Sequence, residues 1–163
     1  LRAKIARKNV YVTTEYETED LAIKADRAKI SQVFINLLTN ATKFNREGGR
    51  ITIRVAKGSG GMLDVEVQDT GIGIPAEEQN RIFERFYQVH SAPHKAYEGT
   101  GIGLSIVKDI LAMHGCSIRV ESRLGEGTTF AFNLPLGRPS PDGSGGGAGE
   151  IRTTPRNNER TRL

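Results

Sequence analysis

Two periodicities of apolar residues divide the first part of the chain into a helix and a hairpin. From residue 27 to residue 44, apolar side chains recur three and four positions apart, the spacing of a helix with one face on a core, and Asp26 stands at the N-cap position. The stretches RITIRVAK and MLDVEVQD instead alternate with a period of two and are separated by GSGG. This alternation predicts an antiparallel hairpin directly after the helix.

Shorter patterns predict the remaining elements. Residues 10–25 contain two short strands around a polar turn, and the segment from Pro75 to about Arg85 has a helical pattern with proline in its first turn. A further helix follows GTGIGL and ends near His114, and two strands, CSIRVES and TTFAFNLP, complete the fold. Because strands and helices are grouped without regular alternation, the pattern favours the α+β class: a two-layer α/β sandwich with a mixed, mostly antiparallel sheet and helices on one face.

The composition changes after Leu136. The segment from residue 137 to residue 163 is rich in Gly, Pro and Arg and poor in apolar residues, so it buries too little surface to offset chain entropy, and disorder is predicted there. Residues 8–136 are therefore predicted to form one domain. Residues 1–7 (LRAKIAR) are compatible with the end of a connecting helix.

Charge and cysteine content narrow the class of protein. The net charge of +4 comes in part from five arginines against three acids in the tail, and the body has no basic stripe interleaved with aromatic residues, so specific nucleic-acid binding is not expected. The single cysteine, Cys116, cannot form an internal disulfide, and no apolar run approaches the length that crosses a bilayer. We therefore expect a cytoplasmic segment of a longer chain that makes no membrane contact.

A polar stripe interrupts the predicted helix at residues 27–44. Asn36, Asn40 and Lys43 are four and three positions apart, which places them together on one helix face beside the buried arc. This placement predicts a polar lip of a cavity.

One glycine cluster follows an aspartate at the end of a predicted strand, and a second precedes a predicted helix. Asp69 shares the apolar side of its strand and precedes Gly71 and Gly73, which permit a tight turn and close backbone approach by a ligand; a buried carboxylate there needs a donor, and the amino group of adenine would suit it. Ordinary turn chemistry is the alternative explanation for Asp69. The second cluster, GTGIG at residues 99–103, precedes a helix whose free amides can receive phosphate oxygens, although glycine before a helix is common. It is neither a Walker P-loop nor the dinucleotide fingerprint.

The three elements in this order, an Asn/Asn/Lys stripe, DxGxG and GxGxG, resemble the Bergerat ATP-binding fold of the GHKL superfamily. RIFERFYQV is similar to the F box of sensor histidine kinases, and GEGTTFAFNLP to the last strand signature of that family. The resemblance covers about Lys8 to Leu136 and implies the ATP-binding catalytic domain of a two-component sensor histidine kinase. It also implies that the chain is the cytosolic part of a sensor, which can be membrane-anchored.

The resemblance implies a role for each motif residue. Asn40 and Asn36 would hold Mg²⁺, with Asn36 as a second metal or phosphate ligand, and Lys43 would neutralise phosphate charge; these three are the implied catalytic residues. Asp69 would bind the adenine amino group, Phe44 would border the base, and Tyr87 to Glu98 would form a lid that Phe83 and Phe86 anchor to the core. The full implied ATP set is Asn36, Asn40, Lys43, Phe44, Asp69, Gly71, Gly73, Ile74, Gly99, Thr100, Gly101, Gly103, Leu104 and Thr128.

Asparagine at position 36 narrows the expected reaction. Hydrolysing relatives carry glutamate there as a general base, and an amide cannot take that proton, so the site suits positioning of ATP for an outside nucleophile. His90, His94 and His114 lie outside any phosphoacceptor context; the first two are expected in the exposed lid, and His114 as a cation at a helix C-terminus. The implied partners are therefore a helical dimerisation and phosphoacceptor domain and a response regulator.

Three alternatives stay open on sequence alone. They are an anti-sigma-factor-type serine kinase, a non-catalytic nucleotide-gated interaction module, and a nucleic-acid-binding protein that uses the arginine-rich tail.

Overall fold

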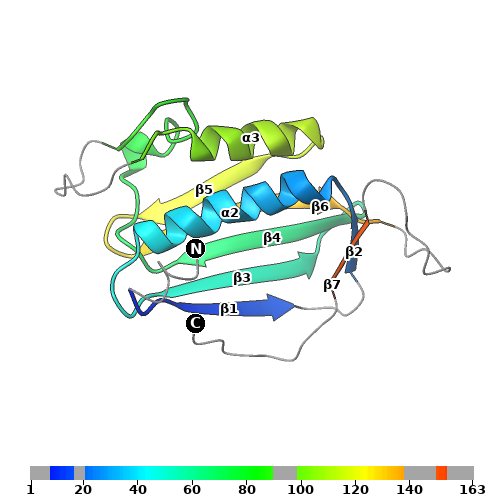
Figure 1. The fold of residues 1–163 in the computed structure, drawn as a ribbon, viewed down its shortest axis with the longest axis horizontal. Helices are drawn as coiled ribbons and strands as arrows, with labels where there is room; N and C mark the ends of the chain where they lie inside the picture. Colours follow the sequence, from blue (N-terminus) through cyan, green and yellow to red (C-terminus); the bar gives the residue numbers. More distant parts are fainter. Residues whose placement is uncertain (1–7, 17–20, 90–98, 138–149, 154–163) are drawn as a thin grey trace.

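The computed structural model describes residues 8–16, 21–89, 99–137 and 150–153, and two layers make up this part of the chain (Figure 1). A five-stranded sheet has the order β1-β3-β4-β6-β5, and helices α2 and α3 cover one of its faces (Figure 1). β1 runs parallel to β3, and all other neighbours in this sheet are antiparallel. The predicted two-layer sandwich with a mixed, mostly antiparallel sheet is confirmed. The described elements are β1 (Tyr11–Tyr16), β2 (Leu21–Lys24), α2 (Arg27–Lys43), β3 (Arg50–Lys57), β4 (Met62–Asp69), η1 (Ala76–Glu78), α3 (Gly103–Met113), β5 (Ile118–Arg123), β6 (Gly127–Pro135) and β7 (Glu150–Thr153).

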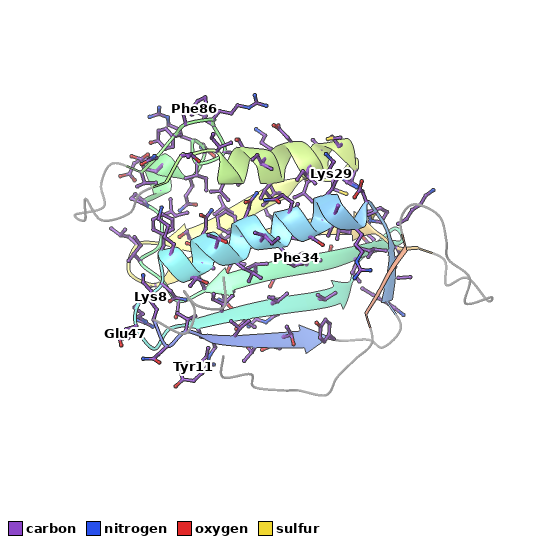
Figure 2. The ribbon with its side chains drawn as sticks, in the orientation of Figure 1. Lys8, Tyr11, Lys29, Phe34, Glu47 and Phe86 are labelled. Carbon is purple, nitrogen blue, oxygen red and sulfur yellow. The ribbon has the colours of Figure 1, made fainter. Side chains whose placement is uncertain are left out.

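The core lies between the helices and the inner face of the sheet. Asp26 caps α2 as predicted, since its carboxylate accepts a hydrogen bond from the Lys29 amide at 3.0 Å. Phe34 of α2 packs edge-on against Phe132 of β6, with ring centroids 5.9 Å apart, and its position between the layers is visible in Figure 2. The largest fully buried side chains come from both layers: Leu37, Ile51, Leu111, Leu134, Val33, Val65, Val67, Val107 and Thr42.

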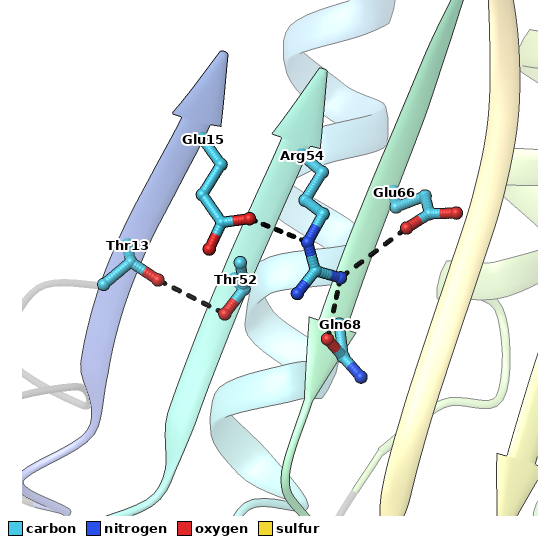
Figure 3. A network of polar contacts seen from close by, with 6 residues as sticks. All are labelled: Thr13, Glu15, Thr52, Arg54, Glu66 and Gln68. Carbon is cyan, nitrogen blue, oxygen red and sulfur yellow. Dashed lines mark hydrogen bonds and ion pairs between the residues drawn. The ribbon is translucent and has the colours of Figure 1, made fainter. Parts of the chain in front are cut away.

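The opposite face of the sheet carries polar side chains that bond across strands (Figure 3). The Arg54 guanidinium in β3 donates to Glu15 in β1 at 2.8 Å and to Gln68 in β4 at 2.9 Å, and it lies 3.7 Å from Glu66. In an antiparallel sheet that has one face on the core and the other in contact with water, apolar and polar residues alternate along each strand. The network therefore lies on the side of the sheet away from the helices.

The prediction of a helix from Pro75 to about Arg85 is wrong for most of this segment. Only the single 3-10 turn η1 forms, followed by further hydrogen-bonded turns that do not make a helix. Phe83 packs against Phe130 of β6, and the amide of Phe86 donates to the carbonyl of Gly101 at 2.9 Å, with Phe86 at φ +64. These long-range contacts redirect the backbone and override the local helical pattern.

Two strands lie apart from the large sheet. β2 pairs with β7 in antiparallel register, and β7 belongs to the segment for which the sequence predicts disorder. The local pattern carries no signal for this strand. The expectations for residues 1–7 and for most of the tail concern segments outside the described residues, as do those for His90 and His94.

His114 joins the two helices rather than acting as the predicted helix-terminal cation. Its Nδ1 lies 2.8 Å from the Ile110 carbonyl, and its Nε2 accepts from the Asp26 amide at 3.2 Å. A carbonyl can only accept and an amide can only donate, so these contacts require the neutral ring with the proton on Nδ1. The end of α3 is thereby fixed to the start of α2.

No helix in the described part of the chain is both long and apolar enough to cross a membrane.

Candidate functional site

A cavity of about 520 Å³ opens between the C-terminal half of α2, the loop after β4 and the segment before α3. The ends of α2 and β4 and the start of α3 lie at the same end of the molecule (Figure 1). The volume of this cavity is in the usual range for small-molecule sites. Of the predicted set, the following line it: Asn36, Asn40, Lys43, Phe44, Asp69, Gly73, Ile74, Gly99, Thr100, Gly101, Gly103, Leu104 and Thr128.

The α2 side of the cavity carries the polar stripe. The Asn36 amide oxygen accepts from Gln32 at 3.2 Å, while its buried Nδ2 has no hydrogen-bond partner among the described residues. A buried donor without a hydrogen-bond partner costs free energy, so this group is suited to an acceptor supplied by a ligand. The Lys43 ammonium lies 4.6 Å from the centroid of the Phe44 ring, so positive charge and an aromatic face are adjacent at the end of the helix. This wall is suited to an anion joined to a ring.

Asp69 forms a second, buried wall. It ends β4 on the inner face, is 8% exposed, and accepts a hydrogen bond from the Gly71 amide at 2.8 Å. Burial raises the pKa of Asp69 to about 6, against the opposing effect of backbone hydrogen bonds from Gly71 and Thr128. Such an acceptor inside a cavity suits a neutral N–H donor of a ligand.

Glycine is required where backbones approach closely around the cavity. A Cβ on Gly73, at φ +72, would lie 2.0 Å from the Arg123 carbonyl oxygen, and one on Gly71 would lie 2.5 Å from that of Phe44. Gly71 is the one member of the predicted set that is not among the described lining residues; its amide supports Asp69 instead.

The sequence did not assign several lining residues to the ATP set: Thr39, Ala41, Ile72, Ile82 and Phe130, together with Tyr87, Gln88 and Val89, which were placed only in the lid. Two carried a usable signal. Thr39 is one helical turn from Asn36 and Lys43, and Phe130 is two positions after Thr128 on the same side of β6. Ala41 lies on α2 and Ile72 in the loop after β4, whereas the positions of Ile82, Tyr87, Gln88 and Val89 depend on how the segment after η1 folds back toward α3.

The two phenylalanines of the F-box-like segment differ. Phe83 packs against Phe130 with ring centroids 6.3 Å apart, as expected of an anchor to the core. Phe86 is 73% exposed and points away from the sheet (Figure 2), so the prediction that its side chain also anchors the lid is wrong. Its backbone, rather than its ring, makes the connection to Gly101.

The buried Asp69 carboxylate predicts a pH-dependent stability. Because its folded pKa of about 6 exceeds its ordinary value of 3.8, the folded state holds the extra proton between these values and the free energy of unfolding falls as pH rises through that window. Asp69→Asn should therefore be more stable than the parent above pH 6, by about 1 to 3 kcal/mol, and the difference should vanish toward pH 4. Urea unfolding of both proteins across this range measures it. A difference that does not change with pH would contradict the assignment.

Comparison with known proteins agrees with this geometry. Residues 25–138 match the family of histidine kinase-, DNA gyrase B- and HSP90-like ATPases. Histidine kinase P4 of Formosa agariphila is 40% identical over 133 residues, which are 80% of this chain and 10% of that protein. The first relatives found are much longer, and the chain spans between 10% and 20% of their length.

Solved structures extend the likeness to the fold. The catalytic domain of histidine kinase ThkA is 36% identical with a TM-score of 0.70, covering 82% of this chain and 84% of that one. ThkA has also been solved in complex with the response regulator TrrA (33% identity, TM-score 0.67, 83% of this chain and 37% of that one). Full-length ShkA in complex with AMPPNP has a TM-score of 0.73 at 29% identity, covering 85% of this chain and 28% of that one. The chain therefore belongs to the family of histidine kinase-, DNA gyrase B- and HSP90-like ATPases, and within it to the catalytic domains of sensor histidine kinases.

Proposed function

We propose that this chain binds Mg²⁺-ATP in the cavity and positions the γ-phosphoryl group for transfer to a histidine on a separate helical dimerisation and phosphoacceptor domain. One observation carries the proposal. Asp69 is the only carboxylate among the described residues that line the cavity, and it is buried and bonded to the Gly71 amide. The described residues of the cavity thus include groups that can bind a nucleotide, but no acid beside the polar stripe of α2 that could activate water.

In this proposal, different residues of the cavity bind the adenine base, the phosphates and the metal ion. Asp69 accepts a hydrogen bond from the adenine amino group, and Phe44 borders the base. The unpaired Nδ2 of Asn36 fits a phosphate oxygen, Lys43 balances phosphate charge, and the amide oxygen of Asn40 is suited to the metal. When bound, Mg²⁺ would supply charge stabilisation and orientation of the phosphates. These roles leave the protein to hold ATP in place for an outside nucleophile, which is the main need of phosphoryl transfer.

The glycines at the start of α3 support the phosphate side of the same proposal. Gly99, Gly101 and Gly103 line the cavity just before the helix, where backbone amides are not yet used within it. Gly101 is at φ +67, and a Cβ there would lie 2.6 Å from the Phe86 carbonyl carbon, so the loop depends on glycine at this point. This segment is accordingly suited to contact phosphate oxygens through its backbone.

The proposed partners follow from the acceptor that the chain needs. Residues 8–136 would act as the catalytic domain, and the phosphoryl group would pass from the acceptor histidine to an aspartate of a response regulator. The complex of the related ThkA with a response regulator supports a response regulator as a partner. We place the chain in the cytoplasm, where ATP and such regulators occur, as the cytosolic part of a sensor.

Transfer in trans tests the proposed function. The chain, γ-labelled ATP and Mg²⁺ are incubated with several dimeric histidine-bearing acceptor domains, and we expect acid-labile, base-stable label on the acceptor and none when its histidine is replaced by glutamine. Acid-stable label on serine would indicate the serine kinase alternative. Nucleotide binding without transfer to any acceptor would favour the nucleotide-gated interaction module.

A variant pair links the label to the cavity. Asn40→Ala should abolish transfer because it removes the proposed metal ligand, whereas Arg54→Met, on the opposite face of the sheet, should leave it unchanged. Equal labelling by both variants would contradict the proposed site.

A further inference from the structure

Lys8 lies against the C-terminal end of α2, far from it in sequence (Figure 2). Its ammonium group donates to the carbonyl oxygens of Lys43 at 2.7 Å and Asn45 at 3.1 Å. Carbonyls at the end of a helix lack N–H partners within the helix, and the helix dipole favours a cation there. Lys8 is therefore a side-chain cap on the helix that carries the polar stripe.

Asn45 continues the connection from this cap. It is buried, its Nδ2 donates to the Arg50 carbonyl at 3.2 Å, and its Oδ1 accepts from the Thr70 hydroxyl at 3.3 Å. Gly49 fits closely over it, since a Cβ there would lie 2.1 Å from the Asn45 Oδ1. A buried amide held at both ends fixes the distance between the segments it joins.

Thr70 completes a cluster behind the cavity. Its hydroxyl accepts from the Arg50 amide at 2.9 Å, and its own amide donates to the Arg50 carbonyl at 3.1 Å. Thr70 stands between Asp69 and Gly71, so the cluster of Lys8, Asn45 and Thr70 ties the end of α2 to the loop after β4. The Ile72 amide, which donates to the Phe44 carbonyl at 3.1 Å, makes a second tie between the same two segments.

The cluster supports the cavity without being part of it. Lys8, Asn45 and Thr70 are not among the described lining residues, but Lys43, Phe44 and Asp69, which they contact or adjoin, are. The two walls that these lining residues form are thus set by bonds made outside the cavity. A change in the cluster can reach a bound nucleotide only by moving those walls or through the field of the Lys8 charge.

We propose that Lys8 is a positioning residue for the nucleotide site, which acts through Asn45 and Thr70 to set the spacing between the α2 wall and the Asp69 wall. This inference rests on the proposed function, because it names a determinant of the same ATP site. It also gives a physical route by which displacement of the backbone at residue 8 alters nucleotide affinity.

Calorimetric titration of the full chain tests the role of Lys8. Lys8→Met should weaken ATP binding roughly fivefold to tenfold, since charge-assisted hydrogen bonds at the helix end are lost, and Lys8→Arg should restore affinity to within about twofold. Arg54→Met is the matched control. It removes a cation with two hydrogen bonds on the other face of the same sheet and should leave ATP affinity within about twofold of the parent.

Adenosine separates positioning from direct charge attraction. If Lys8 acts by placing the walls, Lys8→Met should weaken adenosine and ATP binding by similar factors. A loss confined to ATP would show that the charge acts on the phosphates through space and would overturn the proposal.

Thr70→Val keeps the test valid if Lys8→Met does not fold. This near-isosteric change removes the hydroxyl that donates to Asn45 and accepts from the Arg50 amide, and it should also weaken ATP binding. The double variant should lose less than the product of the two single losses, because both changes act in part through Asn45. Unchanged affinity in a folded Lys8→Met or Thr70→Val protein would overturn the inference alone. Failure of the folded parent to bind ATP would instead overturn the proposed function.

Discussion

Asp69→Asn should weaken ATP binding by roughly tenfold to a hundredfold, the effect of losing a charged hydrogen-bond acceptor in a buried site. Asp69 is nearly inaccessible to solvent and already holds the Gly71 amide. An asparagine oxygen can keep that internal bond, but the amide then directs an NH₂ group toward the adenine amino group. Two donors would face each other where the parent has an acceptor, and isothermal titration calorimetry at about pH 7.5, above the Asp69 pKa of about 6, measures the loss.

A second acid on the same strand provides the control for this variant. Asp64 lies on the outer, exposed side of β4, so Asp64→Asn removes the same charge without touching the cavity. Its ATP affinity should match that of the parent. Retained affinity in Asp69→Asn would show that Asp69 does not contact the base. Equal losses in both variants would show that a general effect of charge operates instead.

Gly73→Ala should destabilise the fold by about 2 to 5 kcal/mol, combining the cost of a left-handed alanine with overpacking against rigid backbone. The new Cβ would lie 2.0 Å from the carbonyl oxygen of Arg123, the last residue of β5 before the turn to β6. Since the Gly125 amide donates to the Ile72 carbonyl at 2.7 Å in the same region, the loop cannot move without breaking bonds. Chemical denaturation gives the change in the free energy of unfolding, and ATP affinity should fall with it because Gly73 lines the cavity.

Gly60→Ala separates the conformational cost of a left-handed alanine from the cost of overpacking against the backbone. Gly60 has a similar φ of +65 in the hairpin turn, and among the described residues no heavy atom lies within 4 Å of the position that an added Cβ would take. Only the conformational cost of about 1 to 2 kcal/mol therefore remains. Equal destabilisation by the two substitutions would contradict the close approach at Gly73.

Local patterns predicted much of this architecture because the information lies within single elements. The N-cap at Asp26, the polar stripe of α2 and the hairpin of β3 and β4 each follow from spacing along a few residues. The inner position of Asp69 followed from the same alternation. These predictions needed no knowledge of distant contacts.

Long-range contacts account for what the sequence did not reveal. The parallel pairing of β1 with β3, the pairing of β2 with β7, and the bonds of Lys8 and Asn45 all join segments whose proximity no local period encodes. The same cause explains the wrong helix after Pro75, where contacts of Phe83 and Phe86 with β6 and Gly101 outweigh helix propensity. In both cases tertiary structure decides between local options.

Amide chemical-shift mapping during titration with ATP, with and without Mg²⁺, tests most directly that this cavity is the nucleotide site. We predict saturable shifts concentrated at residues 36–44, 69–74 and 99–104, with the Asn36 and Asn40 region responding further when Mg²⁺ is added. Absence of shifts in the folded chain, or shifts concentrated around Thr13, Arg54 and Glu66 on the opposite face of the sheet, would contradict the account.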